Sequence, residues 1–143
     1  MDATNSVSMA MQIVAIPWKF HNQKNKSIID LVKETGYFEQ HDQITEGDIQ
    51  TALLCRPEYV QEWRQYSEDQ RSSDAWCLNI PKGGPYEVGC PDANPVQYNS
   101  AIDACAAFIQ HEMEEIRTDD LERTRKHKET VERKRALNRA RNL

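Results

Sequence analysis

The charged residues divide this chain into two regions of opposite sign. Residues 1–116 contain 18 acidic and eight basic residues, a formal net charge of −10, and residues 117–143 contain ten basic and five acidic residues, a net charge of +5. Apolar residues at helical spacing also stop at Ile116. We therefore expect a single hydrophobic core, built from the first region only.

The length and composition fit one ordinary domain. The chain has 143 residues, of which 38% are hydrophobic and 29% are charged. No stretch approaches the roughly 20 apolar residues that span a bilayer. The apolar run 9–16 is short and lacks the basic start of a secretory signal. We expect a cytoplasmic protein that does not contact a membrane.

Three hydroxyl residues precede an aspartate by three positions, the spacing of a capping box at a helix start. The first pair predicts a short helix that ends at Gly36, since glycine readily takes the left-handed conformation past a helix end. The second predicts a helix that ends before Pro57. The third predicts the start of a long last helix. The pairs are Ser27 with Asp30, Thr45 with Asp48, and Ser100 with Asp103.

A third short helix is expected after Pro57, because proline is favoured at the first helical position. Its apolar stripe comprises Tyr59, Val60, Trp63 and Tyr66. The aromatic residues of this stripe, together with Trp76, could stack on nucleic-acid bases. The surrounding region is acidic and repels phosphates, however, so packing in the core is the better interpretation.

The apolar period changes from 3.6 to 2 after Ser73, which predicts a β-hairpin. Residues 81–85 (PKGGP) form the turn. Pairing Leu78 with Val88 also pairs Ile80 with Tyr86 and Trp76 with Cys90, and it gives one apolar face. That register places Cys77 and Cys90 on opposite faces, which argues against a disulfide between them.

The last helix changes character along its length. Its inward stripe consists of Ile102, Cys105, Ala106, Ile109, Met113 and Ile116. Residues 117–143 lack Pro and Gly and contain only scattered apolar residues, so they form a lone helix or a disordered tail.

Motifs for catalysis or metal binding are missing. The sequence has no P-loop, GxGxxG, GxSxG or HExxH pattern, and its histidines and cysteines do not have metal-ligand spacing. The cysteines are expected to be reduced thiols. We expect no enzymatic activity, no cofactor and no bound metal. The residues considered are Cys55, Cys77, Cys90, Cys105, His21, His41, His111 and His127.

Several segments between residues 27 and 117 are similar to a group of known proteins. They are 29–38 (IDLVKETGYF), 44–48 (ITEGD), 63–71 (WRQYSEDQR), 73–78 (SDAWCL) and 101–117 (AIDACAAFIQHEMEEIR). In this order they resemble small bacterial immunity-type proteins of contact-dependent inhibition and polymorphic toxin systems. The resemblance implies a protein that binds a toxin domain and blocks it by occlusion.

The acidic charge fits that function, because a nuclease must be basic where it holds phosphate. We expect Glu58, Glu62, Glu68 and Asp69 to contact a basic toxin domain. The alternative is a non-enzymatic adaptor or assembly module whose basic C-terminal helix binds an acidic protein or nucleic acid. Nucleic acid could bind only through residues 117–143, electrostatically and without sequence preference, because this region lacks aromatic residues.

The expected fold is α+β and mainly helical, with three short N-terminal helices, a small antiparallel hairpin or sheet, and a long C-terminal helix. It comprises an N-terminal segment (1–26), an acidic globular body (27–116) and a basic helical or disordered tail (117–143). Residues 11–16 can add an edge strand to the sheet. The expected core is Ile28, Val32, Phe38, Ile49, Leu53, Val60, Trp63, Trp76, Leu78, Val88, Ile102, Ala106, Ile109 and Met113.

Overall fold

The structure is a computed structural model that describes residues 3–23, 25–69, 76–89 and 94–142. The chain divides into two compact units, Met1–Met113 and Glu114–Leu143. We call them the N-terminal unit and the C-terminal unit. Each is described by itself.

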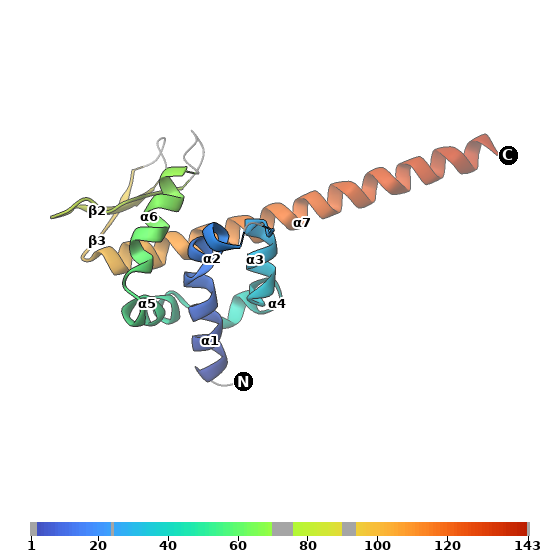
Figure 1. Cartoon of the computed structure of the whole chain (residues 1–143). Helices are drawn as coiled ribbons and strands as arrows, with labels where there is room; N and C mark the ends of the chain where they lie inside the picture. Colours follow the sequence, from blue (N-terminus) through green and yellow to red (C-terminus); the bar gives the residue numbers. More distant parts are fainter. Residues whose placement is uncertain (1–2, 24, 70–75, 90–93, 143) are drawn as a thin grey trace. The chain divides into compact units, whose positions relative to one another are not determined.

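The predicted α+β fold, mainly helical with a small antiparallel sheet and a long last helix, is confirmed (Figure 1). Helices dominate the part of the chain before the sheet, and one helix follows it. In order, the elements are α1 (Ala3–Val14), α2 (Ile16–Asn22), α3 (Ile28–Glu34), α4 (Tyr37–Gln40), the 3-10 helix η1 (His41–Gln43), α5 (Glu46–Cys55), α6 (Tyr59–Asp69), β1 (Cys77–Asn79), β2 (Tyr86–Gly89), β3 (Val96–Tyr98) and α7 (Ala101–Arg141).

The capping signals mark real helix starts. Complete capping boxes begin α3 and α5, with Ser27 Oγ and Thr45 Oγ1 accepting from the backbone N–H of the aspartate three residues later, at 3.1 and 3.2 Å. Ser100 Oγ accepts in the same way, at 3.1 Å, before α7. Gly36 has φ of 85°, and it separates α3 from α4. These local predictions are confirmed because a cap needs only neighbouring residues.

The expectation of an edge strand at residues 11–16 is wrong, because this run belongs to α1 and α2. A short apolar run does not by itself distinguish a strand from a buried helix. Here helix α1 packs on α5, and Trp63 Nε1 donates to the carbonyl oxygen of Val14 at 3.0 Å. The N-terminal segment therefore contributes to the core through Met9, Ala10, Ile13, Val14, Ala15 and Ile16.

The strands of the sheet lie in the order β1-β2-β3, and both neighbouring pairs are antiparallel. Leu78 pairs with Val88 as predicted. The expected pairing of Trp76 with Cys90 lies outside the described residues, because Cys90 is not among them. The third strand is β3, which follows the hairpin in sequence and pairs with β2.

The core of the N-terminal unit surrounds the first part of α7, where every residue from Ala104 to Ile109 is buried. A helix that is buried on all sides needs neighbours on all sides. Most of the expected core is confirmed as buried: Val32, Ile49, Leu53, Val60, Trp63, Leu78, Val88, Ala106, Ile109 and Met113. Ile28, Phe38, Trp76 and Ile102 are only half-buried, and Tyr37 is buried in place of its neighbour Phe38.

Candidate functional site

Helix α6 has one buried and one exposed face. Trp63 and Tyr66 are buried, and their ring centroids lie 5.2 Å apart in an edge arrangement. Both rings also contact Phe108 of α7, at 6.2 and 6.4 Å. Core packing of these two aromatics is therefore confirmed. Because these contacts hold the helix, they also fix the direction of the side chains on its exposed face.

Of the acidic residues expected to contact a partner, Glu58, Glu68 and Asp69 are exposed, and Glu62 is half-buried at the edge of that face. At about 100° of rotation per residue, Glu58, Glu62 and Asp69 fall within about 40° of one another, whereas Glu68 lies about 80° or more to one side. Glu58 precedes α6 by one residue, in a turn where Tyr59 N–H donates to the Arg56 carbonyl oxygen at 3.1 Å. We call Glu58, Glu62 and Asp69 the α6 carboxylate row.

Only weak contacts hold these carboxylates. Glu58 pairs with Arg56 at 3.4 Å, and the two side chains are 58% and 55% exposed. Asp69 accepts a hydrogen bond from Gln65 Nε2 at 3.0 Å. Glu62 forms no ion pair with any described residue. Because exposed pairs contribute about 0–1 kcal/mol, a partner's cations can replace them at little cost.

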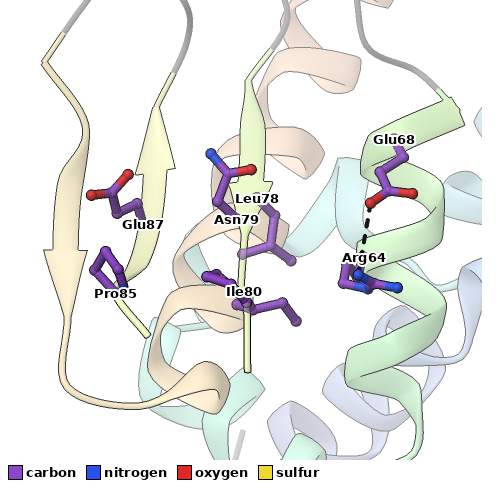
Figure 2. A pocket seen from close by; sticks show the side chains of 8 residues that line it. Arg64, Glu68, Leu78, Asn79, Ile80, Pro85 and Glu87 are labelled. Carbon is purple, nitrogen blue, oxygen red and sulfur yellow. Dashed lines mark ion pairs between the residues drawn. The ribbon is translucent and has the colours of Figure 1, made fainter. Parts of the chain in front are cut away.

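Glu68 instead lines a groove of about 340 Å³ between α6 and the hairpin, as Figure 2 shows. A second hollow of about 430 Å³ shares Arg64, Ile80 and Pro81 with this groove. We call the two together the α6–β1 groove. Its walls are Gln61, Arg64 and Glu68 from α6, Leu78 to Gly83 around the end of β1, Pro85, Tyr86 and Glu87 around β2, and Ala101.

Arg64 lies at the junction of the two hollows. Its Nη1 is 3.8 Å from Glu68 Oε1, as the dashed line in Figure 2 marks. Its Nε atom is buried and has no hydrogen-bond partner among the described residues. A guanidinium with unused donors suits a planar acceptor such as a carboxylate. The sequence gives no sign of this role for Arg64 beyond its position four residues before Glu68.

Ser67 joins the two walls of the groove. Its hydroxyl oxygen is buried and accepts a hydrogen bond from the backbone N–H of Leu78 at 2.9 Å. Since β1 is an edge strand, this N–H has no strand partner on that side. The bond therefore ties the free edge of β1 to α6.

Replacing Ser67 with alanine should lower the free energy of unfolding by about 1–3 kcal/mol, because it leaves the buried Leu78 N–H without an acceptor. Urea denaturation followed by circular dichroism measures the change. The control is Thr51→Ala, which removes an exposed hydroxyl from α5 and should cost less than about 0.5 kcal/mol. Equal stability of the two variants would show that the bond does not hold β1.

A second cluster joins α6, β1 and α7. Tyr66 Oη donates to Glu112 Oε2 at 2.5 Å, and Glu112 is half-buried. The half-buried ring of Trp76 stacks on that of exposed His111, with centroids 4.1 Å apart and planes at 9°. Within the described ranges, no three histidine, cysteine or acidic side chains are grouped so that they could hold a metal ion.

The chain was compared with protein-family models, curated proteins and solved structures, and none of them matches it. In the part of the chain that the structure describes, no helix has the length and apolar character to cross a membrane.

Proposed function

We propose that this chain is a non-enzymatic, immunity-type protein of the cytoplasm that binds a basic partner domain, a nuclease toxin, and occludes its substrate surface. The observation that carries the proposal is the α6 carboxylate row on a helix anchored by Trp63 and Tyr66. The N-terminal unit as a whole contains 16 acidic and eight basic residues. Its field therefore attracts a cationic domain and repels the phosphates for which that domain is built.

The row and the groove have different roles in this docking. The carboxylates of the row accelerate association with a cationic surface and disfavour acidic partners, while each one contributes modestly to affinity. Arg64 adds specificity, because its guanidinium is 43% exposed and only loosely paired with Glu68, at 3.8 Å, so its Nη atoms can donate to an acceptor on the partner. The partner of this site is thus a protein surface that is mostly basic, with one carboxylate or carbonyl oxygen placed to meet Arg64.

Neutralising the row should weaken this binding by about 100-fold, on the order of 1 kcal/mol for each carboxylate. The variant is Glu58→Gln/Glu62→Gln/Asp69→Asn. Calorimetry with the toxin domain encoded beside this gene measures the affinity, and stopped-flow mixing should show that the association rate falls with salt. The matched control, Glu34→Gln/Glu39→Gln/Asp42→Asn, makes the same change of charge on α3, α4 and η1.

Two results would contradict the proposal. One is the absence of binding at micromolar concentration. The other is an equal loss of affinity in both variants, which would show that only the total charge matters and that α6 is not the contact surface.

The second candidate function is an adaptor that uses the basic C-terminal helix, and the concentration of unpaired cations near the end of α7 favours it. Deleting residues 117–143 distinguishes the two functions. Docking through α6 predicts that toxin neutralisation survives the deletion, whereas the adaptor function predicts that association is lost.

A further inference from the structure

Among the described residues of the C-terminal unit, ion pairs are confined to its first part. Residues 114–132 contain seven acidic and five basic residues. Arg117 pairs with Glu114 at 2.5 Å, and Arg125 pairs with Glu122 at 2.5 Å and with Glu129 at 2.6 Å. The hydrogen bond from Arg125 lowers the pKa of Glu122 below its ordinary value. We call residues 114–132 the paired segment; its acidic residues outnumber its basic ones by two, so it has no excess of cations.

Residues 133–142, which we call the terminal segment, differ from the paired segment in their charge. They contain five basic residues and no acidic one: Arg133, Lys134, Arg135, Arg139 and Arg141. All five are exposed, and none forms an ion pair or side-chain hydrogen bond with the described residues. Glu129, which lies four residues before Arg133, is already held by Arg125. Five free cations thus occupy about 15 Å of helix.

Four of the five cations of the terminal segment form two flanks, and Arg133 lies on the opposite side of the helix. By helical rotation, Lys134 and Arg141 lie within about 20° of each other, and Arg135 and Arg139 lie within about 40° of each other. The two pairs are separated by roughly 100° or more. A helix that meets a flat anionic surface needs its cations on one face only, so this two-sided arrangement points to a concave partner with anions on both walls.

Polar amides lie between the two flanks. Asn138 falls about 40–60° from Lys134 and Arg141 on one side and about 60–100° from Arg135 and Arg139 on the other. Asn142 follows four residues later, where its N–H donates to the Arg139 carbonyl oxygen at 3.3 Å. The opposite side carries Ala136, Ala140, Arg133 and a single exposed large apolar residue, Leu137. It lacks the broad apolar face with which a basic helix enters a membrane surface.

From this arrangement we infer that the terminal segment binds in the major groove of duplex DNA. That groove is about 12 Å wide and admits an α-helix, with phosphates along both walls and base edges on its floor. The flanking arginines and lysine meet the phosphates of both strands. Asn138 and Asn142 face the bases, where an asparagine amide can bond both N6 and N7 of adenine. Duplex RNA is excluded because its major groove is deep and narrow.

The two asparagine amides change the expectation that residues 117–143 bind nucleic acid without sequence preference. Aromatic stacking is absent, but amides directed at base edges give a sequence preference that cations alone do not. DNA binding by the terminal segment does not require a partner on α6. The experiments on DNA binding and on toxin binding can therefore each fail without the other.

The first test measures the affinity of the full chain for a labelled 20-base-pair duplex of mixed sequence by fluorescence anisotropy. Contact of the four flanking cations with four phosphates predicts a slope of about −3.6 for log affinity against log salt, which is roughly a 150-fold loss between 50 and 200 mM. Changing all five terminal cations to glutamine should abolish binding. Glutamine keeps helix propensity, and circular dichroism checks that the helix remains.

The matched control removes five cations from the N-terminal unit: Lys19, Lys26, Lys33, Arg56 and Lys82, each to glutamine. It has the same net charge as the terminal variant and should retain DNA binding within about threefold. Equal loss in both variants, or no binding of the unchanged chain at 50 mM salt, would overturn the inference.

The second test concerns the groove and the amides. Selection from a random duplex pool should enrich adenine, and Asn138→Ala/Asn142→Ala should lose that enrichment while its affinity falls less than about tenfold. Equal affinity for duplex RNA, for vesicles with anionic lipid or for polyglutamate would overturn groove binding, because it would show attraction to any polyanion.

Discussion

Replacing Trp63 with alanine is expected to lower the free energy of unfolding by about 3–5 kcal/mol. The side chain is fully buried and is among the largest in the core. Its ring contacts Tyr66 and Phe108, and its indole N–H satisfies the carbonyl oxygen of Val14, at the end of α1. The substitution therefore leaves a cavity. It also removes the N–H donor to the Val14 carbonyl oxygen, and with it the hydrogen bond that links α6 to α1.

Urea denaturation monitored by circular dichroism measures this effect. The control is Trp18→Ala on α2, where the side chain is 45% exposed and its loss should cost less than about 1 kcal/mol. If both variants lost the same free energy, the burial of Trp63 would not be what holds the N-terminal unit together. The Trp63 variant should also weaken partner binding, because α6 would no longer be held rigid.

Cys55 is expected to react with a thiol reagent at least about a thousandfold faster than Cys105. Cys55 is exposed, whereas Cys105 is buried in α7. The thiolate is the reactive form, and burial raises the pKa of the Cys105 thiol far above its ordinary value. Reaction of Cys105 then requires unfolding, and a stability of 5 kcal/mol or more reduces its rate by that factor.

The same burial predicts a dependence on pH. Because the folded state raises the pKa of Cys105, it favours the neutral thiol, and this stabilisation is complete below the thiol's ordinary pKa of 9.0. Above that pH the unfolded chain ionises first, so the free energy of unfolding should fall.

The difference in reactivity between the two thiols is measured by brief iodoacetamide labelling, and mass spectrometry locates the modified cysteine. Labelling of both thiols in parallel without denaturant would show that α7 is not buried there.

Local signals predicted the helices and the hairpin well. The capping boxes of α3 and α5 and the register of Leu78 with Val88 depend on residues that are near in sequence. The prediction of a strand at residues 11–16 failed because a short apolar run fits a helix and a strand nearly equally well. The packing of α1 on α5 decided between the two. Packing decided in the same way that Tyr37, and not the adjacent Phe38, is buried.

The candidate site was predicted in part. Glu58, Glu68 and Asp69 are exposed, and Glu62 is half-buried. The sequence predicted all four as partner contacts from the acidic charge of the region. It did not reveal that Glu68 lines a groove, because the other wall of that groove is β1. Arg64 and Ser67 were missed for the same reason, since their contacts involve residues on two elements.

The sequence by itself determined the division between an acidic and a basic region, the starts of the capped helices and the hairpin register. Each of these depends on spacing within one element or on charge. Only the tertiary structure decided that the first residues belong to the core, that α6 and the edge of β1 enclose a groove, and that Trp63 joins α6 to α1. Such contacts arise between segments distant in sequence, where packing selects among arrangements that are locally equivalent.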